Sequence, residues 1–335
     1  MRSILVLMIA AFLAACAPRV APPGPGPAAP RLTETHFTTS DGLALAVRKW
    51  LPQGTPRAVV LGVHGFNDYS KAFDVAPDAP GVGPTLAAQG IAVYAYDQRG
   101  FGQSPHWGLW PGRDAMVGDF KDIASALQAM YPGVPFYPMG ESMGGAVVMT
   151  ALADANAPKV TGAILVAPAV WGRSTMPVFY RAALWLGSRF LPGFKPSGES
   201  LGRLASDNLE ALRANGRDPL FIKKTRIDSV YGLTGLMDEA LASAPKIAKT
   251  PVLYLYGQND QIIPKGPTRE AIAAMGRADV GLHPAFYEKG WHMILRDKQA
   301  PVVLGDIVAF MQNPQEALPS GADVRAVQRL AAARD

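Results

Sequence analysis

The stretch Gly140-Glu141-Ser142-Met143-Gly144-Gly145 has the G-x-S-x-G form of a nucleophile elbow. The short apolar run 134–139 comes before it, and the helix-forming run 146–155 follows it. A strand that turns this sharply into a helix holds its middle residue at strained backbone angles and needs glycine where strand and helix cross. The motif fixes only three positions, so it is this strand-before, helix-after context that favours a nucleophile at Ser142 over a chance match.

Around this elbow, short apolar runs alternate with helical segments. The runs cover residues 58–63, 91–96, 161–167, 252–256 and 285–287. A continuous apolar run is typical of a strand that is buried on both faces. Residues 35–39 and 43–50 alternate around a Ser-Asp-Gly turn signal, which predicts an opening hairpin. The pattern therefore predicts an α/β fold with a mostly parallel, doubly wound sheet and helices on both faces.

The N-terminus has the pattern of an export signal. Arg2 is followed by the apolar run 4–13, which is too short for a stable membrane anchor, so we predict a signal peptide over residues 1–15. Residues 13–16 read Leu-Ala-Ala-Cys, which resembles the bacterial lipobox, and Cys16 is the only cysteine of the chain. Ala17 follows it, and in lipoproteins a residue other than Asp there points to the outer membrane. An ordinary signal peptide with an incidental cysteine is the alternative.

These features predict where the chain resides and how it is divided. We expect a bacterial cell-envelope lipoprotein that is anchored to the membrane through Cys16 and faces the periplasm from the outer membrane. Residues 16–31 are rich in Pro, Ala and Gly, which predicts an extended tether of about 40 Å at roughly 3 Å per residue. The core domain is expected over 32–170 and 251–312, with a C-terminal tail over 313–335.

The segment 171–250 interrupts the alternation of strands and helices. It is about eighty residues long without a strand signal, far longer than a usual connection, so we predict an inserted helical cap. Within it, residues 176–191 form a predicted helix that is apolar on more than one face. Such a helix is either packed into a core on both sides or is a lid that borders the substrate. We expect a lid, with Phe179 and Trp185 as candidate acyl-pocket residues.

The partners of Ser142 are found after the two last predicted strands. Asp260 follows the run 252–256, and His292 follows the run 285–287, so both lie at the carboxyl edge of the sheet. A serine hydroxyl needs an imidazole to accept its proton, and the imidazole needs a carboxylate to fix its tautomer. The other histidines lie elsewhere, and Asp297 is expected in a helix, which leaves Ser142, Asp260 and His292 as the predicted catalytic residues.

Catalysis of this kind also needs two backbone N–H groups that stabilise the oxyanion. The residue after the nucleophile, Met143, is expected to supply one of them. The loop after the run 58–63 reads His64-Gly65-Phe66, and Phe66 is expected to supply the other. We expect His64 to brace this loop by hydrogen bonding.

Together with Gly257-Gln258-Asn259-Asp260 and Gly290-Trp291-His292, these motifs resemble the α/β-hydrolase fold, specifically its monoacylglycerol lipase and lysophospholipase branch. The resemblance covers about residues 35–312. It implies a serine hydrolase that acts on esters, with the triad and oxyanion donors named above. One departure is Phe66, because the better-known members have a small residue at this position.

The remaining composition narrows the function classes. The net charge of +5 is scattered without a basic block, so no nucleic-acid partner is expected. The sequence has no zinc, phosphate-loop or dinucleotide motif, so no metal or cofactor is expected. We predict a serine hydrolase that cleaves carboxylic esters of single-chain lipids, of monoacylglycerol or lysophospholipid type, through an acyl-enzyme on Ser142. The alternatives are a short-chain carboxylesterase or peptidase of the same fold, or a non-catalytic lipid-binding lipoprotein of the envelope. The oligomeric state stays open.

Overall fold

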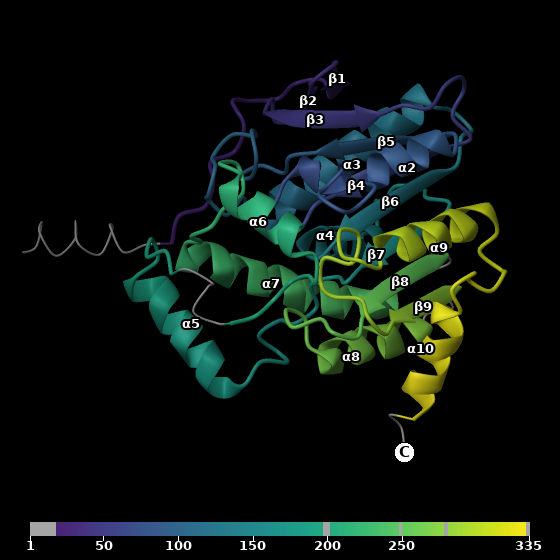
Figure 1. Cartoon of the computed structure of the whole chain (residues 1–335). Coiled ribbons are helices and arrows are strands. Elements are labelled where there is room, and N and C mark those ends of the chain that lie inside the picture. The colour runs from purple at the N-terminus through teal and green to yellow at the C-terminus, as the bar shows by residue number, and fades with distance from the viewer. Residues whose placement is uncertain (1–17, 197–201, 248–249, 278–280, 333–335) are drawn as a thin grey trace, which may run out of the picture.

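A single twisted sheet organises the computed structural model, which describes residues 18–196, 202–247, 250–277 and 281–332. Among these residues the strand order is β1-β2-β3-β5-β4-β6-β7-β8-β9 (Figure 1). The strands are β1 (Arg31–Leu32), β2 (His36–Thr38), β3 (Ala44–Trp50), β4 (Ala58–Val63), β5 (Ile91–Tyr96), β6 (Phe136–Glu141), β7 (Ala163–Val166), β8 (Val252–Gly257) and β9 (Leu282–Tyr287).

The sheet has an antiparallel edge and a parallel centre. Strands β1, β2 and β3 pair antiparallel, and β3 joins β5 antiparallel, as the predicted opening hairpin requires. From β5 through β4, β6, β7 and β8 to β9 every neighbouring pair is parallel. The carboxyl ends of these strands therefore share one edge of the sheet, and the expected mostly parallel, doubly wound sheet of an α/β-hydrolase fold is confirmed.

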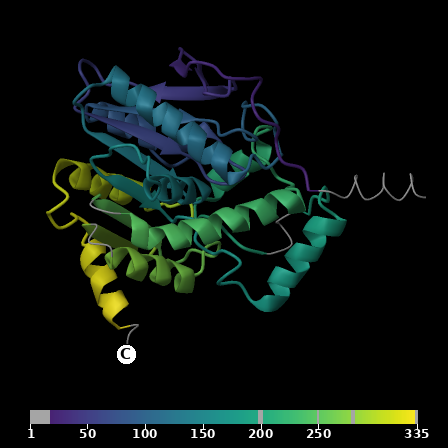
Figure 2. The same cartoon turned by 180° about the vertical axis from the view of Figure 1, so that it is seen from behind.

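Helices cover both faces of the sheet (Figures 1 and 2). One face packs against α3, α4, α7 and α8, and the other packs against η1, α2 and α9. Burial on both faces explains the continuous apolar runs, since every residue of β4 and β5 is buried. The helices outside the cap are η1 (Ser70–Phe73), α2 (Val82–Ala88), α3 (Arg113–Met130), α4 (Met143–Leu152), α8 (Lys265–Gly276), α9 (Ala300–Gln312) and α10 (Ala322–Ala331).

The described part of the segment between β7 and β8 consists of helices joined by loops and contributes no strand to the sheet. It contains α5 (Val178–Phe190), α6 (Leu209–Arg217), α7 (Ile227–Ser243) and η3 (Ala244–Lys246). Among the described residues, helix α5 packs mainly against α7 and most of its side chains are exposed, so that Phe179 is 65% exposed and Trp185 is 49% exposed. The alternative in which this helix is packed into a core on both sides is therefore wrong. Within the described ranges, no helix is both long and apolar enough to cross a membrane.

The proline-rich segment 18–30 does not extend away from the domain. The backbone N–H of Arg19 donates to Asp228 Oδ2 at 3.0 Å, and that of Ala21 donates to the Trp110 carbonyl at 2.8 Å. Further along, the N–H of Ala28 donates to the Ser40 carbonyl at 2.9 Å. An extended proline-rich backbone makes no internal hydrogen bonds, so its polar groups are available to the domain surface. The expected spacer of about 40 Å is wrong for these residues, and we call segment 18–30 the N-terminal strap.

The C-terminal tail is also ordered over residues 313–332. Helix α10 lies along the edge strand β9, with Ala322 and Ala326 buried. The side chain of Arg325 donates to the carbonyl of Phe286 in β9 at 3.4 Å. An uncovered edge strand exposes unpaired backbone groups, and α10 covers this one.

Candidate active site

The elbow is sharper than the sequence pattern indicated. Strand β6 ends at Glu141 and α4 begins at Met143, three residues earlier than the predicted helix, so Ser142 alone makes the turn. Its backbone has φ 52° and ψ −115°, a conformation that is unfavourable for a residue with a side chain. The strain is held in place by hydrogen bonds, because the Ser142 N–H donates to Val166 and the Ser142 carbonyl accepts from Ala169, both at 2.9 Å.

Two glycines of the motif are required by close backbone contacts. A Cβ on Gly140 would lie 2.5 Å from the carbonyl oxygen of Gly144. A Cβ on Gly144 would lie 1.9 Å from the carbonyl oxygen of Val63 in the neighbouring strand. These contacts let α4 start against the sheet, and they place Ser142 at the carboxyl edge.

The structure brings the three predicted catalytic side chains together. His292 Nε2 lies 3.0 Å from Ser142 Oγ, and His292 Nδ1 lies 2.8 Å from Asp260 Oδ2. The other oxygen of Asp260 accepts the backbone N–H groups of Ile262 and Ile263 at 2.7 and 2.9 Å. The carboxylate is therefore fixed, its contact fixes the Nδ1–H tautomer, and Nε2 is free to accept the proton of the serine.

Burial and charge act in opposite directions on the catalytic imidazole. Burial lowers the pKa of His292, but the charge of Asp260 and its hydrogen bond raise it, and Glu141 adds to the increase. The net result is a pKa above the usual 6.5. A more basic imidazole is a better acceptor for the serine proton, provided that the pH is high enough to keep it neutral.

The oxyanion position lies between two segments. A Cβ built on Gly65 would lie 3.3 Å from Ser142 Cβ, which shows how closely the loop after β4 approaches the nucleophile. Over the described part of the chain, the backbone N–H groups of Phe66 and Met143 have no acceptor. Two free N–H groups beside a serine nucleophile are what an oxyanion requires.

The loop that carries Phe66 is held from both sides. His64 Nδ1 donates to the Gly65 carbonyl at 2.8 Å, and His64 Nε2 accepts the N–H of Gln98 at 3.0 Å, so His64 has the bracing role expected. The Phe66 ring packs edge-on against Phe101 and Trp110. This aromatic contact accommodates the large side chain that departs from the pattern of the better-known family members.

Sequence reasoning missed one residue that supports the histidine loop. Asp297 was expected in a helix, but it lies in the turn before α9 and is fully buried. Its two oxygens accept the N–H groups of Trp291 at 2.8 Å and Gln299 at 2.7 Å, and burial raises its pKa to about 7. The sequence carries no clear signal for this role, because Asp297 lies two residues before Gln299, the N-cap of α9.

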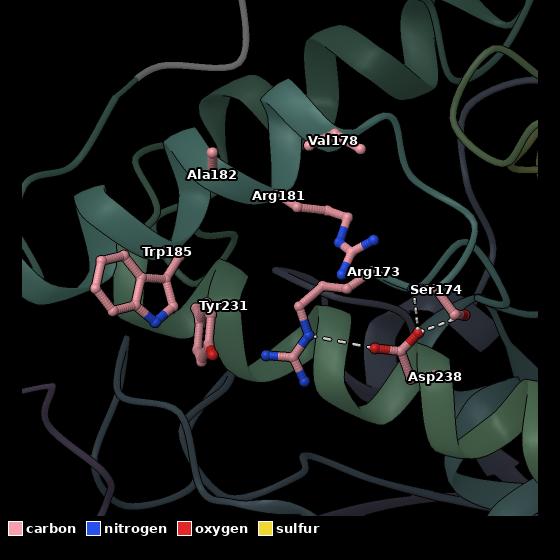
Figure 3. Close-up of a pocket in the computed structure, with 8 residues that line it drawn as sticks. All are labelled: Arg173, Ser174, Val178, Arg181, Ala182, Trp185, Tyr231 and Asp238. Atoms are coloured by element: carbon pink, nitrogen blue, oxygen red, sulfur yellow. Dashed lines mark hydrogen bonds and ion pairs between the residues drawn. The ribbon is translucent and has the colours of Figure 1, made fainter.

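The two candidate acyl-pocket residues do not lie against the triad. Phe179 stacks on its neighbour Tyr180. Trp185 lines a cavity of about 620 Å³ between α5 and α7, together with residues of the cap only (Figure 3). In this cavity Arg173 pairs with Asp238 at 3.2 Å. The lipidation candidate, Cys16, lies outside the described residues.

Comparison with known proteins agrees with this geometry. A monoacylglycerol lipase from Mycolicibacterium smegmatis is 25% identical over 283 residues, which covers 83% of this chain and 96% of that protein. Human monoglyceride lipase is 27% identical over 240 residues, covering 68% of this chain and 73% of that protein. The crystal structure of a monoacylglycerol lipase from Paleococcus ferrophilus superposes with a TM-score of 0.63 at 24% identity, covering 80% of this chain and 98% of that one, which shows a shared fold.

A family match covers most of the chain. Residues 54–299 match the hydrolase family described as serine aminopeptidase, S33. The matched range contains the elbow serine, the acid after β8 and the histidine after β9, and it also contains the whole cap. By sequence and by fold, the chain belongs to the S33 family of α/β hydrolases.

Proposed function

We propose that this chain is a serine hydrolase that cleaves carboxylic esters of single-chain lipids, of monoacylglycerol or lysophospholipid type. The observation that carries the proposal is the relay from Ser142 through His292 to Asp260, with contacts of 3.0 and 2.8 Å. The names of the M. smegmatis and human relatives support a lipid ester as the substrate.

The reaction follows from the geometry. Ser142 Oγ attacks the ester carbonyl carbon while His292 Nε2 takes the hydroxyl proton, and Asp260 stabilises the imidazolium. The oxyanion accepts hydrogen bonds from the N–H groups of Phe66 and Met143. As the intermediate collapses, His292 returns the proton to the leaving alcohol, and the acyl group stays on Ser142. Water, deprotonated by His292, then attacks the acyl-enzyme and releases the carboxylic acid.

Within the described residues, the cap cavity offers no unpaired carboxylate for a peptide amino terminus. A site for a peptide amino terminus needs an unpaired carboxylate. In the cap cavity the carboxylate of Asp238 is paired with Arg173 and also accepts the hydroxyl of Ser174 at 2.7 Å. Arg181 adds a further positive charge to the lining of this cavity (Figure 3). This cavity contains no triad residue, so the choice between an ester and a peptide is decided by a substrate panel.

One substrate panel tests the proposal. The purified protein is assayed on p-nitrophenyl esters of increasing chain length, on monoacylglycerols and lysophospholipids, and on aminoacyl p-nitroanilides, with fluorophosphonate labelling of Ser142 alongside. We expect labelling at Ser142, hydrolysis of the lipid esters, and little release from the anilides. Faster turnover of the anilides would make the chain a peptidase, and the absence of both labelling and ester turnover would support the non-catalytic lipid-binding alternative.

We also propose that the chain is anchored to the outer membrane through an acylated Cys16 and acts in the periplasm. The lipobox-like residues 13–16 support this placement. The strap begins two residues after Cys16. The backbone N–H of Arg19 donates to Asp228 in the first turn of α7, and this turn lies beside the C-terminal end of α5 (Figure 1). Helix α5 exposes large apolar side chains and contains no acidic residue, so a membrane beside the anchor would meet an uncharged or basic surface.

Replacing the single cysteine tests the anchor. Cys16→Ala removes the acylated atom, so the protein should move from the membrane fraction to the soluble fraction. The specific activity of detergent-solubilised protein should stay unchanged, because the triad does not involve this residue. If the variant stays in the membrane fraction to the same extent, the lipid anchor is not what holds the protein there.

A further inference from the structure

Arg296, Asp68 and Glu141 form a buried ionic cluster next to the segments that carry the proposed catalytic residues. Arg296 is only 5% exposed, and its guanidinium contacts two carboxylates. Nη1 lies 2.7 Å from Asp68 Oδ2, and Nη2 lies 3.0 Å from Glu141 Oε2. Both carboxylates are themselves buried, at 6% and 2% exposed. Charged groups are almost never buried in this way unless they are paired, so the three side chains depend on one another.

Each member of the cluster belongs to a different catalytic segment. Glu141 is the residue directly before the nucleophile Ser142, and Asp68 is two residues after the oxyanion donor Phe66. Arg296 follows His292 by four residues in the same loop. A single guanidinium therefore joins the segments that supply the nucleophile, the oxyanion N–H and the base.

The backbone around Arg296 extends this connection to the cap. The Arg296 carbonyl accepts a hydrogen bond from Asn208 Nδ2 at 2.9 Å, and the Asn208 side chain caps α6 by accepting the N–H of Ala211. In the same loop, the N–H of Met293 donates to the carbonyl of Ala205 at 2.8 Å. The loop that carries the base is thus fixed to the core on one side and to the cap on the other.

We propose that Arg296 is a positioning residue for the ester hydrolysis proposed above, holding the serine, the oxyanion loop and the histidine at their reactive separations through Glu141 and Asp68. The planar guanidinium suits this role because it donates to both carboxylates in a fixed geometry, which a lysine ammonium on a flexible chain does not reproduce. Small displacements of reacting groups are costly, since an error of about 1 Å lowers the rate by about a hundredfold. The proposal therefore predicts an effect on kcat.

The chain offers a matched control elsewhere. Arg99 is also buried and also bridges two carboxylates, contacting Asp41 at 2.9 Å and Asp119 Oδ2 at 2.7 Å. These partners lie in the hairpin turn after β2 and in α3, and neither segment carries a triad residue or an oxyanion donor. Within the described chain, Arg99 contacts no triad residue and no oxyanion donor, and its loop reaches the Phe66 segment through Gln98 and Phe101. Substitution of Arg99 therefore reports the loss of a buried ionic cluster with a much smaller effect on catalytic positioning than substitution of Arg296.

The experiment compares Arg296→Ala and Arg296→Lys with Arg99→Ala and Arg99→Lys. Active sites are first titrated with a fluorophosphonate, so that kcat refers to folded, reactive enzyme only, and melting temperatures are measured in parallel. We expect all four variants to melt earlier. Only the Arg296 variants should lose kcat on a p-nitrophenyl ester, by about a hundredfold for Ala and less for Lys, with KM changed little.

Chemical rescue sharpens the test. Arg296 lines a cavity of about 300 Å³ between the loop after β4 and α6, which gives a guanidinium ion access to the position that Arg296→Ala leaves open. Millimolar guanidinium, far below denaturing concentrations, should raise the kcat of Arg296→Ala at least tenfold above its value without guanidinium. It should not increase the activity of Arg99→Ala or of the unmodified enzyme.

Each result decides one question. If wild type is not labelled at Ser142, the proposed function fails. If wild type is labelled and the titrated Arg296 variants keep full kcat, the positioning role is overturned and the cluster serves stability alone. Should Arg296→Ala not fold, Arg296→Lys and the near-isosteric Glu141→Gln decide in the same way, and normal titrated kcat in both would overturn the proposal.

Discussion

The strands that lead to the catalytic edge and helix α5 of the cap are both rich in apolar residues, but the edge is buried and α5 is exposed. At the edge, His292 is 7% exposed and each of its ring nitrogens contacts a neighbouring side chain. In α5, Phe179 is 65% exposed and stacks only on its neighbour within the described chain. The first region is fixed by contacts from distant segments, and the second is held mainly by its packing on α7.

This difference shows that hydrophobicity alone does not decide burial. The strands are buried because helices cover both of their faces, whereas in the described part of the chain α5 packs mainly on α7. The exposed apolar surface has to be explained by what it meets outside the domain, and a membrane is the occupant that the proposed anchor provides.

The largest expected effect is at the catalytic edge. Ser142→Ala removes the nucleophile while the oxyanion donors remain, so ester hydrolysis should fall on the order of a thousandfold or more. The melting temperature should stay within about 2 °C of wild type, since no buried contact other than that with His292 is lost. Steady-state assay and calorimetry on the same sample check both points, and unchanged turnover would remove Ser142 from the mechanism.

Paired truncations test the contrast in packing. Phe120 in α3 is fully buried, so Phe120→Ala should lower the free energy of unfolding by about 3–5 kcal/mol. Phe179→Ala removes the same side chain from an exposed position and should change the free energy of unfolding by less than about 0.5 kcal/mol. Urea unfolding of both variants measures the two values. Equal losses would mean that α5 is packed in solution against something other than α7.

The pH dependence of activity tests the electrostatics at the edge. Because the pKa of His292 lies above 6.5, the imidazole is protonated on the acid side and cannot accept the serine proton. kcat/KM should therefore rise with pH through a midpoint above 6.5, falling about tenfold for each pH unit below that midpoint. Asp260→Asn removes the charge that raises this pKa, so the midpoint of the residual activity should move to lower pH. A midpoint that does not move would mean that another group titrates.

The smallest effect is expected in the cap. If Trp185 bordered an acyl channel, each buried methylene would contribute about 0.8 kcal/mol, or about fourfold in kcat/KM, and Trp185→Ala would flatten the chain-length preference. The cavity that Trp185 lines contains no triad residue, so we expect the ratio of octanoate to acetate hydrolysis to change by less than about twofold. Measuring this ratio for Trp185→Ala, with Phe179→Ala as the control, separates the two cases.

Local patterns in the sequence predicted the parts of the molecule that depend on local properties. The bounds of β4 and β5 agree with their apolar runs to the residue, because strands buried on both faces contain no polar positions that blur their ends. The three triad residues were predictable because each directly follows a predicted strand, and the carboxyl ends of parallel strands lie at the same edge of the sheet. The start of α4 was placed three residues late, since the glycines of the motif have low helix propensity and yet lie within the helix.

Other features depend on partners far away in the chain. The contact of Arg296 with Asp68 spans 228 positions, and nothing near either residue in the sequence indicates it. Composition predicted an extended backbone for the strap but contained no information about the surface on which it lies. The exposure of α5 was likewise not predictable, because the sequence pattern of an apolar helix is the same whether it packs in a protein core or against another surface.

The strap also has a consequence for the order in which the protein assembles. Its first bond joins Arg19 to a carboxylate 209 positions later, so the strap can dock only after α7 has been made and packed. Long-range contacts of this kind form late in folding. If the proposed anchor is correct, the strap next to Cys16 would therefore remain undocked while the rest of the domain is still folding. That interval is when enzymes that process and acylate the N-terminus would have unhindered access to it.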